Sequence, residues 1–465
     1  MSPSNPPYPP GAPSSPYSGG APGVPNADVA PGGRSGRRAV RTTTRRRAAL
    51  RWLFEGTPGR LRLLGIGAVL ACLVLSLVGS TAFSTRQSAL ADARADAAQL
   101  IRVQEIATQL VKADSLFTNG NLAYGLEAPK NLVAYDAAVA EASDLIADAS
   151  AANGDDAAAL TKVNAALSEY AARVAASRAN NNQGYQVATG YLHQASDLLR
   201  GNEKVKVTGM LPTLQQLMGD NSARVDAAYS RSGRATWILL GAVLLALGGL
   251  FVVQVRLARI TRRYLNVPLV GASAAVFLVL VTGAVVMVTA QRSANTVHDT
   301  SYKDLQNVAT ARIQAYTAKS AESISLIYRG TGGDYASADT RYTAATTDAA
   351  ARLVGVGGGD ELKAWRGAHD TVFQKAAGKG AGAWQNAAVA ATGEGSAEAP
   401  TINSTFAAFD EVTVRTLDDR AATVDVGLTR GHLGLLLLTW IAIVVGVIAA
   451  AASWTGISQR LEEYR

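Results

Sequence analysis

The sequence contains little cysteine, little histidine and few aromatic residues. Among 465 residues there is one cysteine, Cys72, and aromatic side chains make up only 6%. A single cysteine excludes a disulfide framework and a thiolate metal site within one chain, so the folded parts must be stabilised by packing. The four histidines lack the spacing of metal ligands: His193, His298, His369 and His432. We therefore expect no metal and no cofactor.

The motifs of common enzymes are also missing. The sequence has no glycine-rich phosphate loop, no nucleophile elbow, and no motif set of a kinase or cyclase. It therefore predicts a protein that is not an enzyme.

Four long stretches contain no ionisable residue, and each is long enough to cross a bilayer as a helix: 63–83, 235–255, 267–290 and 433–454. A signal peptide is the alternative for the first, but its apolar run exceeds a signal core and a long segment precedes it. Ion-coupled transporters keep an ionisable residue at membrane depth, so its absence argues against transport. Small residues in these stretches favour close helix packing, within the chain or in a homodimer: Ala242 with Ala246, Gly248-Gly249, Gly271 with Ala275, and Gly446 with Ala450.

The charged residues are sorted by position. Segments 1–62, 256–266 and 455–465 hold 16 Lys and Arg against 4 acids, whereas the remainder holds 28 basic and 32 acidic residues. Positive charge in short loops marks the cytoplasmic side of a membrane. We predict a multi-pass protein of the plasma membrane, with both termini cytoplasmic and two external segments, 84–234 and 291–432. The formal charge of +8 then reflects orientation and attraction to lipid, and nucleic-acid binding is not expected.

The N-terminal segment has two parts. Residues 1–33 carry ten of the fifteen prolines, which predicts a disordered tail. Residues 34–62 are a basic run that anchors the first span at the lipid surface. In the alternative interpretation, phosphorylation of Thr42, Thr43 or Thr44 switches this lipid contact.

The first external segment carries hydrophobic residues at alternating steps of three and four, which predicts an antiparallel helical bundle. One stripe is Val103, Ile106, Leu110, Ala113 and Phe117. A second is Leu132, Tyr135, Val139, Ala142 and Ile146. A third is Leu160, Val163, Leu167, Tyr170 and Val174, and a fourth runs from Met210 through Leu214 and Leu217 to Val225. Residues 181–196 are polar and interrupted by glycine, so we expect a poor helix there.

The second external segment repeats this plan, with helices expected at about 300–328, 339–353, from 360 onward, and 401–430. Weak helix is expected beyond Gly378, and a flexible loop at 392–399. Ala113-Asp-Ser115 and Ala321-Glu-Ser323 fall at matching points near the end of each first helix. The predicted fold is thus all-α: four transmembrane helices and two extracytoplasmic helical bundles in an internal repeat.

Two sets of residues are candidates for contact with partner proteins. Outside, the turns and the polar stretch supply Tyr124, Tyr185, Tyr191, His193, Arg329 and Tyr335. Inside, the loop and the C-terminal tail supply Arg256, Arg259, Arg262, Arg263, Tyr264, Arg460 and Tyr464. The alternative for each outer candidate is an ordinary residue of a bundle turn.

Several local motifs accompany this arrangement, in which each half consists of a span, a helical bundle and a second span. They are Gln183-Gly-Tyr185, Gly190-Tyr-Leu-His-Gln-Ala-Ser-Asp-Leu-Leu199, Met210-Leu-Pro212, Glu322 with Leu326, and Arg329-Gly330. With the basic N-terminus, they resemble the GlnX-like four-pass membrane component of the actinobacterial glutamine/glutamate sensing system. The resemblance covers about residues 35–465, although 355–399 departs into low complexity. It implies a GlnH-type solute-binding protein as partner outside and a PknG-type serine/threonine kinase as partner inside.

These observations predict a transmembrane signal relay between such partners. The bundles are also similar to the sensor domains of chemoreceptors, although no coiled signalling stalk follows, so a direct small-molecule sensor is the second hypothesis. A non-catalytic scaffold of the cell envelope is the third. A direct sensor would bind ligand with its external domains, a relay would bind a carrier protein, and a scaffold would do neither.

The sorted charge generates a test of topology. Cysteines introduced as Ser150→Cys and Ala391→Cys should react with a membrane-impermeant thiol reagent in intact cells, because both sites are predicted outside. Thr261→Cys should not react. Labelling at position 261 alone would contradict the proposed orientation.

Overall fold

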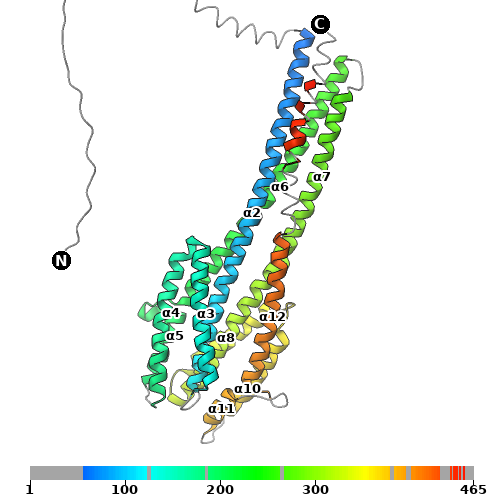
Figure 1. Cartoon of the computed structure of the whole chain (residues 1–465). Coiled ribbons are helices and arrows are strands. Elements are labelled where there is room, and N and C mark those ends of the chain that lie inside the picture. Colours follow the sequence, from blue (N-terminus) through cyan, green and yellow to red (C-terminus); the bar gives the residue numbers. More distant parts are fainter. Residues whose placement is uncertain are drawn as a thin grey trace, which may run out of the picture. The chain divides into compact units, whose positions relative to one another are not determined.

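The computed structural model describes residues 56–122, 127–183, 187–261, 267–377, 382–393 and 400–429, with parts of 440–455. The described chain is helical, without a β-strand (Figure 1). The first half contains α2 (Gly56–Leu122), α3 (Pro129–Ala152), α4 (Gly154–Asn181), α5 (Val187–Arg200), the short η1 (Glu203–Val205) and α6 (Met210–Thr261). The second contains α7 (Val267–Val297), η2 (His298–Tyr302), α8 (Lys303–Thr331), α9 (Tyr335–Arg352), α10 (Gly359–Ala376), α11 (Ala383–Thr392) and α12 (Ile402–Thr429).

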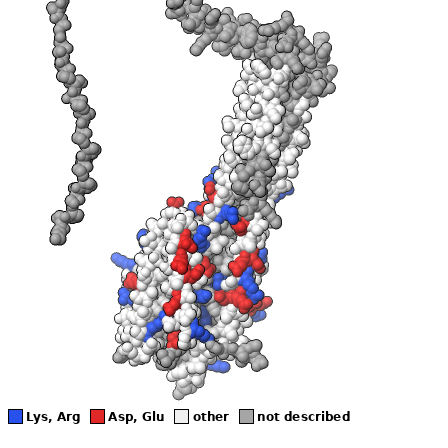
Figure 2. Space-filling view, in the orientation of Figure 1, with Lys and Arg blue, Asp and Glu red and all other residues white. Residues whose placement is uncertain are grey.

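Helices α2 and α6 are much longer than the others because each joins an apolar stretch to an amphipathic one without a break. Helix α2 has 67 residues and α6 has 52. Two segments within them are long and apolar enough to cross a membrane, Gly65–Leu122 and Met210–Arg256. Figure 2 shows no acidic or basic side chains on the visible apolar parts of these helices, whereas mixed charges cover the bundled helices. The predicted third span lies in α7, and half of the predicted fourth lies outside the described residues.

The two predicted external bundles share one hydrophobic core. A single cluster of buried residues includes Val103, Leu167 and Leu214 from the first half and Trp365 and Phe409 from the second. Helix α8 is buried around most of its circumference, including Ala315, Ala318 and Ala321. Because α8 is buried on most sides, other elements enclose it. The contact of α8 with α2, called the seam below, therefore joins the two halves.

The heptad stripes on α2 and α4 are confirmed. Every residue of these two stripes is buried, from Val103 to Phe117 and from Leu160 to Val174. The stripe on α3 is wrong at its first position, because Leu132 is 42% exposed. Ala138 is buried and Val139 is only partly buried, so the buried face of α3 is rotated slightly from the predicted stripe.

Two segments expected to be weak helix form regular helices. Within residues 181–196, α5 begins at Val187, and it buries Ala188, Leu192, Ala195 and Leu199. Beyond Gly378, α11 buries Ala387, Ala388 and Ala391, so a cysteine at position 391 would be shielded from a thiol reagent and Ser150→Cys carries the outer side of the topology test. Burial of these residues against neighbouring helices outweighs their weak intrinsic helix propensity.

The small residues of the apolar stretches have two different surroundings. A side chain at Gly446 would collide with Ser76 of α2, so this glycine allows close packing within the chain. By contrast, Gly248, Gly249 and Gly271 face open space. Close packing within the chain is thus confirmed at Gly446, whereas Gly248, Gly249 and Gly271 leave the homodimer alternative open.

The core generates a matched pair of substitutions. Leu167→Asp should lower the free energy of unfolding by about 3 kcal/mol or more, because it places an unpaired carboxylate in the core. Leu132→Asp should cost little, since this side chain is exposed. Thermal unfolding of the purified full-length protein, followed by circular dichroism, measures both. Equal stability of the two variants would contradict the assigned core.

Candidate functional site

A buried carboxylate, Asp114 of α2, lies at the centre of the seam. It follows Ala113 of the buried stripe and is only 1% exposed. Its Oδ2 accepts hydrogen bonds from the Arg200 guanidinium (2.5 Å) and from the Ser320 hydroxyl (2.6 Å). Its Oδ1 accepts a weaker one from the Tyr170 hydroxyl (3.3 Å). One side chain therefore connects α2 with α4, α5 and α8.

The Asp114 network is electrostatically compact. Arg200 is also largely buried, so carboxylate and guanidinium are paired away from water, where charge-assisted hydrogen bonds are strong. Burial and the neighbouring Asp114 charge raise the pKa of Tyr170 well above its usual value. Tyr170 thus stays neutral and donates its proton to the carboxylate.

A second buried carboxylate, Glu322 of α8, occupies the matching point of the second half. Its two oxygens accept from the Lys319 ammonium (2.6 Å) and from the Nδ1 of His369 on α10 (3.0 Å). Burial alone would raise its pKa, but the Lys319 charge and the His369 hydrogen bond outweigh burial and hold the pKa below the usual value. The His369 ring stacks between Tyr342 and Phe373, at centroid distances of 3.7 and 3.9 Å.

Asp114 and Glu322 are the acidic residues of the two matching tripeptides noted in the sequence. Both are about 1% exposed, and each is bound by a basic side chain of another helix. Each half therefore holds a buried acid near the end of a long helix, α2 in the first half and α8 in the second. A polar centre of this kind specifies one arrangement of helices more strictly than apolar packing does.

A groove of about 350 Å³ runs along the other side of the seam, between α2, α8 and α12. Its charged lining residues are Glu105, Lys112, Arg312, Asp410 and Asp418. The Arg312 guanidinium donates to Asp410 at 2.8 Å and lies 3.9 Å from the Glu105 carboxylate. Gln104, which is 5% exposed, also lines the groove. The groove can hold a small polar molecule in contact with both halves.

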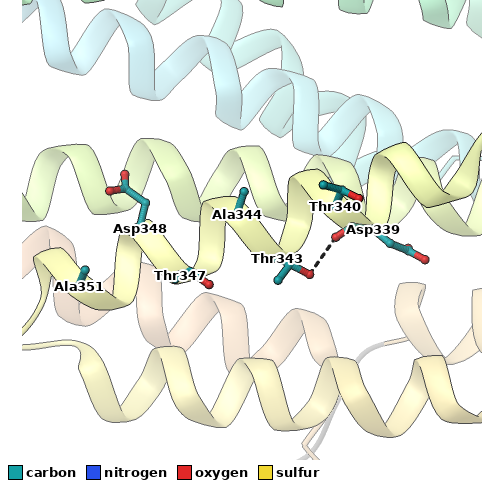
Figure 3. A pocket seen from close by; sticks show the side chains of 7 residues that line it. All are labelled: Asp339, Thr340, Thr343, Ala344, Thr347, Asp348 and Ala351. Atoms are coloured by element: carbon teal, nitrogen blue, oxygen red, sulfur yellow. Dashed lines mark hydrogen bonds between the residues drawn. The ribbon is translucent and has the colours of Figure 1, made fainter.

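A shallow surface pocket follows the outer face of α9 (Figure 3). Its lining is mostly small: Asp339, Thr340, Thr343, Ala344, Thr347, Asp348 and Ala351. Thr343 donates its hydroxyl to the backbone of Asp339, so this threonine is satisfied by its own helix. The pocket offers a smooth helical face without a convergent set of polar groups.

The apolar segments meet the polar bundle at Arg86 of α2. This arginine is fully buried and donates to Thr236 of α6 (2.9 Å) and Gln291 of α7 (2.7 Å). Its Nε and second terminal nitrogen have no partner among the described residues. A buried cation that is only half satisfied is costly. Arg86 thus ties three helices together at a strained junction.

The outer candidates predicted from the sequence are engaged within the fold where the structure describes them. His193 is exposed, and its ring lies 3.0 Å from the Tyr328 hydroxyl. Tyr191 is half-buried. Arg329 pairs with Asp339 at 2.6 Å and lies 4.2 Å from the centre of the Tyr335 ring, which is 44% exposed. Tyr124 and Tyr185 lie outside the described residues.

Two of the inner candidates are described. Arg256 and Arg259 are exposed on the last turns of α6, which continues as helix through Thr261. The other inner candidates lie outside the described residues: Arg262, Arg263, Tyr264, Arg460 and Tyr464.

Sequence patterns did not reveal the buried polar partners. Asp156, in the first turn of α4, is 2% exposed and accepts hydrogen bonds from Gln99, Asn221 and Arg224. The available signal was a charged residue beside an apolar stripe, as with Asp114 next to Ala113. The partners of Asp114 lie 50 or more residues away in the sequence, so the spacing of neighbouring residues could not identify them.

Comparison with known proteins finds one similarity, within the first half. Residues 89–230, from within α2 to within α6, match the family model described as actinobacterial sensor domain. No curated protein and no solved structure matches the chain. The match supports a sensing or signalling role. Together with the two apolar helices, it also supports a location in a membrane.

The Asp114 network generates a stability prediction. Asp114→Ala should lower the free energy of unfolding by about 3–5 kcal/mol, because it leaves the Arg200 charge buried without its partner. Asp144→Ala, at an exposed position of α3, should change it by less than about 0.5 kcal/mol. Chemical denaturation of the full-length protein measures both, and a small effect at Asp114 would rule out its central role.

Proposed function

We propose that the protein is a transmembrane signal relay of the plasma membrane. It couples an extracytoplasmic amino-acid-binding protein to a cytoplasmic serine/threonine kinase, and it has no catalytic activity of its own. Four spans and two cytoplasmic termini follow from the sorted charge. The actinobacterial sensor-domain match and the resemblance to the GlnX-like component support the proposal.

One observation carries the relay: helices α2 and α6 pass without interruption from the sensor-domain segment into the apolar segment. A continuous helix is stiff, so a small shift or rotation at its outer end displaces its inner end as well. The exposed Arg256 and Arg259 lie at the inner end of α6. A kinase that contacts these arginines would receive the displacement directly.

The ends of the helices farthest from the apolar segments offer a docking surface. We call this surface the distal pole, and it contains the exposed apolar residues Leu132, Val133, Val187, Tyr335 and Val389. Exposed apolar and aromatic side chains grouped beside polar turns are typical of protein contacts. The solute-binding protein would bind there, at the ends of α3, α5 and α9.

Direct sensing is the second candidate, and the groove between α2, α8 and α12 favours it. A small molecule in this groove would contact both halves and so stabilise one arrangement of α2 and α8 at the seam. A scaffold or homodimer is the third, and the glycines of the apolar segments that face open space would serve it.

A binding experiment separates these functions. The full-length protein in nanodiscs should bind a purified solute-binding protein in only one of its two states, with or without its amino acid. Val187→Asp and Tyr335→Ala should each weaken this binding at least about tenfold, because each removes apolar contact area at the distal pole.

The controls lie at the opposite ends of the same helices. Val205→Asp, just beyond α5, and Val354→Asp, just beyond α9, change equally exposed valines and should leave binding intact. Binding of the free amino acid without the carrier would favour the direct sensor. Loss of binding in all four variants would place the docking surface elsewhere.

A further inference from the structure

The connection between α7 and α8 is a π-helical turn, η2, rather than α-helix. It lies where α7 leaves its apolar stretch and the buried helix α8 begins. Turns of this kind are rare, weaken the helix locally, and occur often at functional positions. The first residue of this turn is His298.

Both ring nitrogens of His298 face carboxylates. Nε2 lies 2.9 Å from the Asp226 carboxylate of α6, and Nδ1 lies 3.3 Å from the Asp299 carboxylate. A neutral imidazole carries one proton and can donate to only one of them, whereas the imidazolium donates to both. The geometry therefore fits the protonated ring.

Two aromatic rings hold the imidazole in place. Tyr229 of α6 lies 4.4 Å from it and Tyr302 lies 5.5 Å from it, between ring centres. The His298 side chain is 18% exposed, while Asp226 and Asp299 are about 60% exposed. Protons from the outer solution can therefore reach the site, although the ring itself is sheltered.

The titratable groups around His298 are paired or held neutral. Lys303 pairs with Asp299. The hydrogen bonds that Lys303 and His298 donate to Asp299 lower the pKa of this carboxyl group. Burial raises the pKa of Tyr229, and that of Tyr302 to about 12, so both tyrosines stay neutral. The charged groups on the other packed helices are paired with each other: Arg420 of α12 with Asp304, Asp425 of α12 with Arg94 of α2, and Asp96 of α2 with Arg224 of α6.

We propose that His298 is a proton-dependent latch that joins α6 to the π-turn. In the protonated state it attracts Asp226 and Asp299 together and holds the turn against α6. As the pH rises and the ring loses a proton, one nitrogen presents a lone pair to a carboxylate, and this contact becomes repulsive. The latch is therefore closed in acid and released in base.

The latch makes the junction between the membrane and the sensing half responsive to external pH. Histidine is the side chain whose charge ordinarily changes between about pH 5 and 8. Release frees η2, and with it the link from α7 to α8. This input acts on the junction itself, so it operates whether the outer signal is a carrier protein or a small molecule.

Hydrogen–deuterium exchange of the full-length protein in nanodiscs tests the latch without any partner. After correction for the intrinsic pH dependence of exchange, segments 222–230 and 296–304 should be protected roughly tenfold more at about pH 6 than at about pH 8. His298→Gln should abolish this difference, because glutamine does not titrate. Asp226→Asn should also abolish it while the histidine remains.

His193→Gln is the matched control. It removes a histidine that lies in another part of the fold, within hydrogen-bond distance of Tyr328, and the pH difference at 296–304 should persist in it. Equal protection of the wild type at both pH values would overturn the latch, as would an undiminished difference in His298→Gln. Neither outcome depends on binding at the distal pole, so the latch and the relay can fail separately.

Discussion

The carboxylate of Asp114 must be neutralised inside a helical core, and much of the external fold is arranged to do so. Four helices contribute: α2 supplies the acid, and α4, α5 and α8 supply Tyr170, Arg200 and Ser320. Apolar side chains can slide against each other at little cost, but a buried ion pair tolerates little displacement. The two halves are therefore held in a definite register along the seam. Glu322 imposes the same constraint within the second half.

This rigidity contrasts with the junction at the apolar segments. There the chain between α7 and α8 makes a π-turn, and Arg86 is buried with two nitrogens that have no partner among the described residues. In the proposed relay, the bundled helices would move as a unit, and the displacement would be concentrated at this junction, where the π-turn interrupts the helix.

The shared core also changes how the chain can be pictured as a sensor. Two independent bundles would report separately, and their signals would meet only in the membrane. With one core, a displacement of either half would be shared by α2 and α8. In the proposed relay, the groove between α2, α8 and α12 and the distal pole would therefore act on the same pair of helices.

Local sequence patterns determined the helical fold, the apolar segments and most inward-facing positions on α2 and α4. These features depend on the spacing of neighbouring residues, which any chain with this pattern must satisfy. On α5 and α11 the local signal misled, because burial against distant helices outweighs weak propensity. The union of both halves, the partners of Asp114 and Glu322, and the setting of His298 between Asp226 and Asp299 were decided only by the tertiary structure. Each of these brings together side chains from different helices, and the energy that selects them exists only once the helices have packed.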